Sequence, residues 1–301
     1  MRMHDGQVDV DERTVRRLLD AQLPALRDEP IRRVPDASTV NAVFRVGARL
    51  AARLPLVAAE PEAARDGILR EHAAMRELAA RCPVPTPAPV AVGRPGHGYP
   101  MPWAVQTWVP GAVATPGGLA SSPAFARDLG RLVRALRSGP TDGRRVEGGG
   151  RGGDLRAHDA WMAECLDASV GILPVDRLRA MWARFRELPA GGPDVMSHTD
   201  LIPANLLVDG GRLAGVLDGG GFQPADPALD LVAAWHLLDG PARAVLRAEL
   251  GSDDVEWQRG AAWAFEQAMG LAWYYRGSLP SMSALGRSTL ARLLADPATA
   301  A

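Results

Sequence analysis

The chain has 301 residues, of which 47% are hydrophobic and 23% charged, so it has the composition of a globular protein long enough for two lobes. Its formal net charge of −1 argues against a nucleic-acid-binding protein, because such proteins carry a basic excess. The two cysteines, Cys82 and Cys165, have no metal-binding spacing, and we find neither an apolar signal segment nor a bilayer-spanning run. We therefore expect a cytoplasmic protein with reduced thiols and no membrane partner.

The basic residues have one unusual property: all 34 of them are arginine, because the sequence contains no lysine. Any contact with a phosphate group must therefore come from a guanidinium group or from backbone amides.

The first 108 residues predict several short strands and two helices. Asp9 and Glu12 have the spacing of a capping box, which predicts the start of the first helix. A proline-rich connector, Cys82 to Pro89, ends the second helix. The expected helices and strands are, in chain order, Asp9–Leu23, Ile31–Val34, Val43–Val46, Leu50–Leu54, Pro61–Arg81, Val90–Val92 and Trp103–Trp108.

Residues 109–301 predict a mainly helical lobe, because apolar residues recur there at helical spacing. The glycine- and arginine-rich stretch Gly139–Gly153 predicts a flexible loop. The expected helices are Pro123–Leu136, Asp154–Val170, Val175–Leu188, Asp226–Leu238, Ala242–Leu250, Val255–Tyr275 and Met282–Leu294.

One segment of this lobe, Ser197–Gly221, predicts a β-hairpin. Its two apolar runs are Leu206–Val208 and Leu213–Leu217, and the sequence Asp-Gly-Gly between them is typical of a tight turn. Such a hairpin would hold three oxygen-bearing side chains at one end, namely Asp200, Asn205 and Asp218.

Two carboxylates and an amide oxygen are ligands that Mg²⁺ prefers when it binds together with the phosphates of a nucleotide. Phosphoryl transfer also requires a carboxylate that accepts the proton of the attacking hydroxyl group. We assign that role to Asp200, and metal binding to Asn205 and Asp218. The alternative is a surface hairpin with ordinary solvated carboxylates.

The same residues carry a resemblance to a known family. His198-Thr199-Asp200 with Asn205, followed by Leu217-Asp218-Gly219, resembles the H-G-D-x-x-x-x-N and I-D-[FW]-[GE] motifs of the aminoglycoside phosphotransferase family, which is related to the protein kinases. The run from Pro224 to Leu231 resembles the G-D-P-A-x-D-L motif that follows them. The chain departs from the pattern at Thr199, at Ile202, where many members have a second histidine, and at Gly219, where an aromatic residue is usual.

The resemblance implies an α+β, protein-kinase-like fold with two lobes. Residues 1–108 would form a small antiparallel-sheet lobe that binds ATP, or alternatively GTP, with Mg²⁺. Residues 109–301 would form the helical lobe that binds the substrate and carries the catalytic residue. The implied activity is transfer of the γ-phosphoryl group to a hydroxyl group of an aminoglycoside-like or other antibiotic. The alternatives are a kinase of a metabolite alcohol, such as a sugar or an amino alcohol, and a nucleotide-binding pseudokinase without turnover.

The resemblance also implies roles for residues of the nucleotide-binding lobe. Arg53 would contact the phosphates and form an ion pair with Glu71. The backbone of Thr107 and Val109 would bind the adenine base between the lobes. Ser38 lies in a turn that either donates hydrogen bonds to the phosphates or is a plain hairpin loop.

Three further residues of the helical lobe are expected to support the site. His198, Asp226 and Asp230 would brace the catalytic loop by hydrogen bonds. A cationic acceptor would need an acidic pocket near Asp200, for which the candidates are Asp226, Asp230, Asp239 and Glu266.

Overall fold

The computed structural model describes residues 8–35, 40–146 and 149–300, and the chain divides into two compact units. The first unit contains the chain up to Ala80, Pro85–Pro110 and the short segment Val216–Gly220. The second contains Arg81–Val84, Gly111–Gly215 and the chain from Gly221 onward. Asp218 therefore belongs to the first unit, although it is distant from the rest of that unit in sequence.

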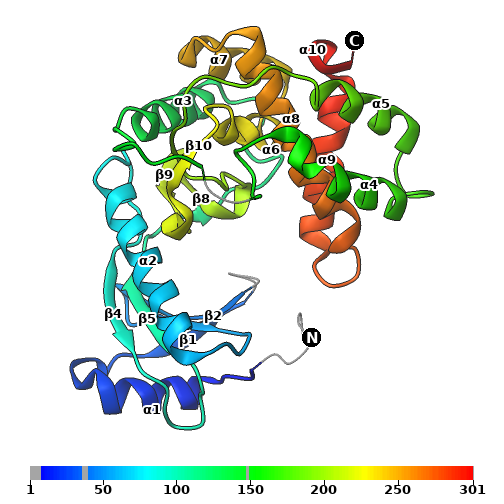
Figure 1. Cartoon of the computed structure of the whole chain (residues 1–301). Coiled ribbons are helices and arrows are strands. Elements are labelled where there is room, and N and C mark those ends of the chain that lie inside the picture. The colour runs from blue at the N-terminus through cyan, green and yellow to red at the C-terminus, as the bar shows by residue number, and fades with distance from the viewer. Residues whose placement is uncertain (1–7, 36–39, 147–148, 301) are drawn as a thin grey trace. The chain divides into compact units, whose positions relative to one another are not determined.

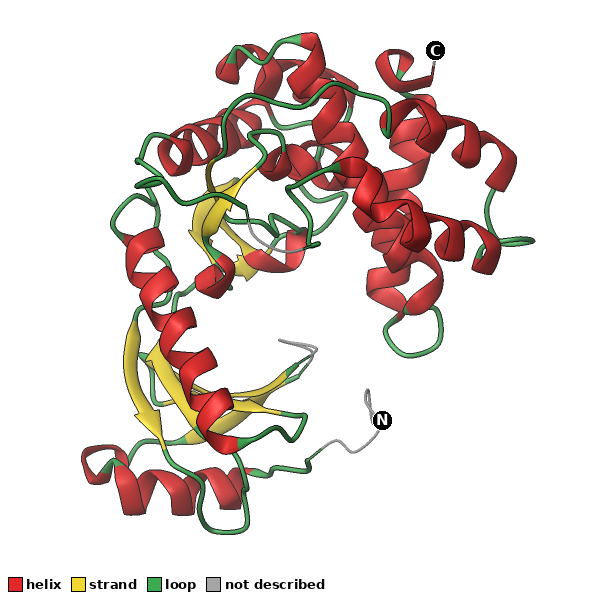
Figure 2. Ribbon diagram, in the orientation of Figure 1, coloured by secondary structure: helices red, strands yellow, loops and turns green. Residues whose placement is uncertain are grey.

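A five-stranded antiparallel sheet forms the centre of the first unit (Figure 2). Its strand order is β1-β2-β3-β5-β4. Residues of β2 alternate between the two faces, so that Ala42, Phe44 and Val46 are buried, as period-2 patterning requires. The strands are β1 (Ile31–Val34), β2 (Asn41–Val46), β3 (Leu50–Pro55), β4 (Pro89–Gly93) and β5 (Trp103–Thr107).

Two helices pack on this sheet (Figure 1). Helix α1 (Glu12–Gln22) contacts β1, and helix α2 (Pro61–Ala79) contacts β4 and β5. The expected cap of α1 at Asp9 is wrong: Asp11 caps the helix, because its carboxylate accepts a hydrogen bond from the Thr14 backbone N–H at 2.8 Å. Glu12 does not complete a capping box, since it accepts the Arg33 backbone N–H of β1 at 2.9 Å.

The second unit is mainly helical, and α8 and α9 are its most extensively packed pair (Figure 1). The expected helix at 154–170 is divided, because Leu155–His158 forms a 3-10 turn before α4 begins. The helices are α3 (Pro123–Arg137), α4 (Asp159–Ala168), α5 (Val175–Phe185), α6 (Val232–Leu237), α7 (Gly240–Leu250), α8 (Asp254–Tyr274), α9 (Pro280–Ala295) and α10 (Pro297–Ala300).

The predicted hairpin is present as β8 (Leu206–Asp209) and β9 (Arg212–Val216). Gly210 and Gly211 both have positive φ, 53° and 77°, which a two-residue turn between antiparallel strands requires. Short strands flank the hairpin: β6 (Ala112–Val113) pairs with β8, and β7 (Val195–Ser197) pairs with β10 (Gln223–Ala225). These short strands were not predicted, because two or three residues are too few to show a period.

A sheet-rich unit and a mainly helical unit together confirm the predicted α+β class. In the part of the chain that the structure describes, no helix combines the length and the apolar character needed to cross a bilayer.

Candidate functional site

Asp200 lies in the loop between β7 and β8, and three side chains of the helical unit hold its carboxylate. Oδ1 accepts a hydrogen bond from Gln267 Nε2 at 2.6 Å and lies 3.3 Å from an Arg151 guanidinium nitrogen. Oδ2 accepts a hydrogen bond from Asn205 Nδ2 at 2.9 Å. The Asp200 side chain is nevertheless 32% exposed, so a base at this position is both oriented and accessible.

Asn205 is mostly buried at the end of the same loop, and its amide nitrogen is fully engaged. Nδ2 donates to the backbone carbonyl of Asp200 and to its carboxylate, each at 2.9 Å. Because an amide nitrogen has two N–H groups, both are used, and the amide oxygen is left to act as a ligand. This arrangement fits the predicted role of Asn205 toward a divalent cation.

Asp230 braces the loop from beneath. Its buried carboxylate accepts hydrogen bonds from the Ser197 hydroxyl at 2.8 Å and from the backbone N–H groups of His198 and Thr199 at 3.1 and 3.2 Å. His198 is completely buried, and Thr199 has a φ of +70°. The position that the family fills with glycine thus keeps a left-handed backbone here, with a β-branched residue in it.

Asp226 has a different partner from the one expected. Its carboxylate binds the Arg259 guanidinium group and the Trp263 indole N–H of α8, and it also accepts the Ala228 backbone N–H. The Asp226 and Arg259 side chains are only 4% and 5% exposed. Asp226 therefore joins α8 to the segment before η5 (Leu229–Leu231), and in the part of the chain that the structure describes its carboxylate forms no hydrogen bond with the loop between β7 and β8.

In the first unit, Arg53 of β3 forms an ion pair with Asp218. The two side chains approach to 3.0 Å, and Asp218 remains 52% exposed. The expected ion pair between Arg53 and Glu71, both of which the structure describes, is not formed. Glu71 lies instead against Gly220, where its Cγ would be 3.1 Å from an added Cβ.

Gly219 has a packing reason that the sequence did not reveal. A Cβ at this position would lie 2.3 Å from a methyl group of Leu78 of α2. The usual aromatic residue is therefore absent where α2 approaches the backbone closely. Asp218 itself has a φ of +58°, so its carboxylate is set by an unusual backbone conformation.

Backbone groups at the end of β5 and just after it form internal hydrogen bonds. Thr107 donates its N–H to the Ala88 carbonyl at 2.9 Å, and its hydroxyl accepts the Ala88 N–H at 2.8 Å. The Trp108 N–H bonds to Arg49 on the opposite side. The Thr107 N–H is thus engaged within the first unit, and the expected role of Thr107 and Val109 toward the adenine base stays a prediction. Ser38 lies outside the described residues.

Ile202 replaces a histidine of the family pattern and is packed in an apolar cluster. It is buried with Leu271 of α8 and Leu285 of α9, and the partly buried Tyr275 and Met282 pack against them. The cluster anchors the loop between β7 and β8 to the α8–α9 pair.

The expected acidic pocket does not form from the candidates named for it. Asp226 and Asp230 are buried in the contacts described above, and Asp239 caps α7 by accepting the Ala242 N–H at 3.0 Å. Glu266 is buried 3.1 Å from His158, and this hydrogen bond raises the pKa of the imidazole. Each carboxylate is held by an internal partner.

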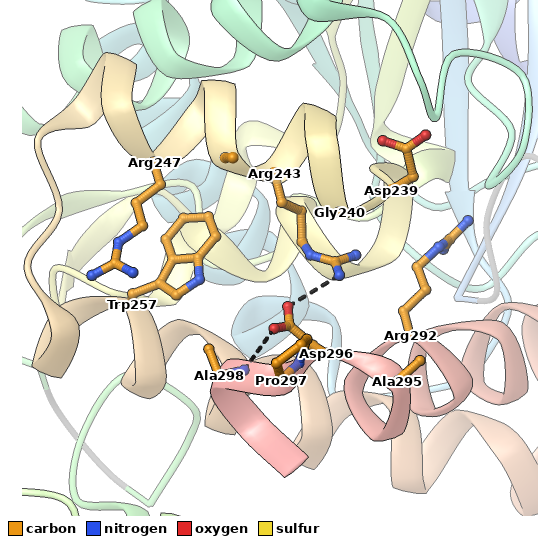
Figure 3. Close-up of a pocket in the computed structure, with 11 residues that line it drawn as sticks. Asp239, Gly240, Arg243, Arg247, Trp257, Arg292, Ala295, Asp296, Pro297 and Ala298 are labelled. Atoms are coloured by element: carbon orange, nitrogen blue, oxygen red, sulfur yellow. Dashed lines mark hydrogen bonds and ion pairs between the residues drawn. The ribbon is translucent and has the colours of Figure 1, made fainter. Parts of the chain in front are cut away.

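A cavity of about 500 Å³ lies elsewhere in the helical unit, among α7, α8, α9 and α10 (Figure 3). Figure 3 shows Arg243 paired with Asp296 and Arg247 beside the Trp257 ring. The Arg243 and Asp296 side chains approach to 3.0 Å. Arg292 donates to the Trp235 and His236 carbonyls at 3.1 and 2.8 Å. None of the predicted catalytic or metal-binding residues lines this cavity.

Sequence reasoning missed two neighbours of Asp200. Arg151 belongs to the glycine- and arginine-rich stretch, for which only a flexible loop was predicted. This loop is held in place because the Gly152 carbonyl accepts a hydrogen bond from the Asp226 backbone N–H at 2.8 Å. Gln267 had a usable signal: Glu266 and Gln267 are the polar positions of an otherwise apolar helical run, Ala261–Leu271. Polar residues inside a buried helix require partners, and the partner of Gln267 is the Asp200 carboxylate.

An antiparallel five-stranded unit followed by a helical unit with this hairpin and loop defines a protein-kinase-like fold. The model of the phosphotransferase enzyme family, APH, matches residues 31–263, and the chain belongs to this family. This confirms both the resemblance and the class of enzyme predicted from the sequence.

Solved structures show the same fold at low sequence identity. The GDP and kanamycin complex of APH(2")-IIIa has a TM-score of 0.70 and 17% identity, covering 91% of this chain and 96% of that one. The macrolide 2'-phosphotransferase MphH from Brachybacterium faecium has a TM-score of 0.59 and 20% identity, covering 90% and 98%. The gentamicin complex of APH(2")-IIa has a TM-score of 0.61 and 16% identity, covering 95% and 97%. No curated protein sequence matches the chain.

Proposed function

We propose that this protein is a nucleotide-dependent O-phosphotransferase that transfers the γ-phosphoryl group of ATP, or alternatively GTP, to a hydroxyl group of a small molecule. The observation that carries the proposal is the environment of Asp200, an accessible carboxylate held by Asn205, Gln267 and Arg151. A carboxylate oriented in this way accepts the proton of an acceptor hydroxyl group as the oxygen attacks phosphorus.

Asn205 and Asp218 would hold Mg²⁺. The Asn205 amide oxygen is left over from the hydrogen bonds to Asp200, and Asp218 is half exposed with one oxygen bound to Arg53. Both donors are oxygens, which suits this cation. When bound, it supplies positive charge to the nucleotide phosphates. Arg53 adds a guanidinium group beside Asp218, in a chain that has no lysine for this purpose.

The acceptor is an antibiotic or another hydroxylated compound. Neighbouring structures include complexes with kanamycin and gentamicin and a macrolide phosphotransferase, which supports an antibiotic acceptor for this chain. The residues near Asp200 favour a neutral or weakly charged acceptor over a polycationic aminoglycoside. Arg151 lies 3.3 Å from Asp200, while Asp226, Asp230, Asp239 and Glu266 are engaged internally.

The experiment that tests the function is phosphoryl transfer from radiolabelled ATP and GTP to a panel of acceptors. The panel contains aminoglycosides, macrolides, sugars and amino alcohols. We expect labelled product with at least one acceptor, and a higher kcat/KM for macrolides than for aminoglycosides. A higher kcat/KM for aminoglycosides than for macrolides would contradict the inference that the site favours a neutral or weakly charged acceptor. Nucleotide binding without transfer to any acceptor would support the pseudokinase alternative instead.

Asp200→Ala then tests the base. Removing a general base lowers kcat by about 10²- to 10⁴-fold, while nucleotide affinity is retained. The matched control is Asp209→Ala, which removes an exposed carboxylate from the tip of the same hairpin. An Asp200→Ala variant as active as the Asp209→Ala variant would exclude Asp200 from the role of base.

A further inference from the structure

A chain of buried hydrogen bonds extends behind Asp200 into the helical unit. Gln267 Nε2 of α8 lies 2.6 Å from Asp200 Oδ1, and Gln267 Oε1 lies 2.8 Å from His236 Nε2 of α6. His236 Nδ1 lies 2.8 Å from the Thr289 hydroxyl of α9. His236 and Thr289 are completely buried, and Gln267 is only 6% exposed.

The direction of every bond in this chain follows from its first member. An ionised carboxylate can only accept hydrogen bonds, so the amide nitrogen of Gln267 must face Asp200. The amide oxygen then faces His236, whose Nε2 must carry a proton. A neutral imidazole has one protonated nitrogen, so Nδ1 accepts the hydrogen bond of the Thr289 hydroxyl group.

The environment of His236 keeps the imidazole neutral. Its pKa is lowered to about 4, chiefly by burial and also by the charges of Arg151 and Arg292, while the Gln267 hydrogen bond opposes this shift. The two arginines and Asp200 are the charged groups that face this chain of hydrogen bonds. Near neutral pH the ring is therefore neutral, and its two hydrogen bonds select one tautomer.

From this geometry we infer that Gln267 is a positioning residue for Asp200, and that His236 and Thr289 fix the orientation of the Gln267 amide group. The inference rests on the proposed function, in which Asp200 accepts the proton of the acceptor. If the Gln267 side-chain amide were flipped, its oxygen would lie against the Asp200 carboxylate and repel it. The imidazole N–H of His236 disfavours this flip, because it requires the amide oxygen as its acceptor. Sequence motifs that stop at the catalytic loop do not contain these residues.

The test is a double-mutant cycle of Gln267→Leu and His236→Leu, measured by kcat and by nucleotide affinity. We expect each single variant to lower kcat by about 10- to 100-fold with nucleotide affinity unchanged, because a misplaced reacting group costs that much. The double variant should be no slower than Gln267→Leu alone, because His236 acts only through Gln267. Independent, multiplying effects would overturn the inference.

Two further variants separate positioning from a general loss of structure. His236→Gln keeps an N–H donor near the position of Nε2 and should recover most of the kcat lost in His236→Leu. Ser283→Ala removes another buried hydrogen bond of the α8–α9 pair, from the Ser283 hydroxyl to the Ala272 carbonyl at 2.6 Å, and should leave kcat unchanged. A Ser283→Ala variant as slow as Gln267→Leu would show that any damage to this helix pair has the same effect.

The arrangement can also be tested without turnover. In ¹⁵N NMR spectra of the whole protein near neutral pH, His236 should show a protonated Nε2 and an unprotonated Nδ1. The opposite tautomer would overturn the inference even if the enzyme is active. If the wild type transfers no phosphoryl group to any acceptor, the proposed function fails, and this measurement still decides whether the Gln267 amide has the assigned orientation.

Discussion

The Asp230 carboxylate accepts the backbone N–H of Thr199 at 3.2 Å, and Thr199 has a φ of +70°. The residue before Asp200 is thus held in a left-handed conformation by a buried carboxylate 31 positions further along the chain. The same carboxylate binds His198 and Ser197, so one side chain determines the path of the loop that presents Asp200. This relationship yields the first two predictions.

Asp230→Ala should lower the free energy of unfolding by about 3 kcal/mol, because it leaves buried backbone N–H groups without an acceptor. Urea denaturation measures this change, and kcat should fall in the same variant because the loop loses its brace. Asp209→Ala, at an exposed turn, is the control. A loss below about 1 kcal/mol would mean that Asp230 is not what holds the loop.

Thr199→Gly should be more stable than Thr199→Ala by about 1 kcal/mol, because a left-handed backbone is strained for a residue with a Cβ and free for glycine. Both variants lose the hydrogen bond from the Thr199 hydroxyl group to the Gly221 carbonyl at 3.3 Å, so their difference isolates the backbone effect. The midpoints of urea denaturation provide the comparison. Equal stability of the two variants would contradict the strain.

The buried ion pair of Asp226 and Arg259 makes the third prediction. Asp226→Asn should destabilise the protein by about 3 to 5 kcal/mol, because it leaves the Arg259 charge buried without a counter-ion. The double variant Asp226→Asn with Arg259→Met should recover part of that loss. Thermal unfolding of the three variants tests this order, and a double variant less stable than Asp226→Asn would refute it.

The fourth prediction concerns the pH dependence of stability. The pKa of His236 is about 4 in the folded protein, against an ordinary value of 6.5. Between pH 4 and pH 6.5 the imidazole therefore binds a proton in the unfolded chain but not in the folded protein. The contribution of His236 to the free energy of unfolding is fully present above pH 6.5 and is lost as the pH falls toward 4. The pKa of His72 is also lowered, chiefly by burial, and contributes in the same direction.

The expected loss from His236 is about 3 kcal/mol over that interval. Urea denaturation at a series of pH values measures it, with His236→Gln as the comparison. That variant should lose less stability than the wild type on acidification. Parallel curves for the two proteins would show that His236 does not titrate as described.

Much of the site could be predicted because its residues are close in sequence. Asp200 and Asn205 belong to one loop, and the turn at Gly210 and Gly211 follows from the conformational freedom of glycine. The spacing of apolar residues likewise predicted the longer strands and most helices, since burial of one face imposes a period. The family model confirms the family that these local motifs indicated.

The pairings of individual charged side chains could not be predicted in this way. The family resemblance suggested Glu71 as the partner of Arg53. Because α2 approaches Gly219 and Gly220 closely, Glu71 lies against the Gly220 backbone instead. Arg53 forms its ion pair with Asp218. Asp226 was expected at the catalytic loop, and it binds Arg259 of α8. A sequence shows which residues carry charge, but the partner of a charge depends on which elements pack together.

By itself, the sequence determined the α+β class, the hairpin, and the candidates for base and metal ligands, because these depend on local spacing and residue chemistry. Only the tertiary structure decided that Gln267, His236 and Thr289 stand in line behind Asp200. These residues come from three different helices, and only the packing of α6, α8 and α9 brings them within hydrogen-bonding distance of one another.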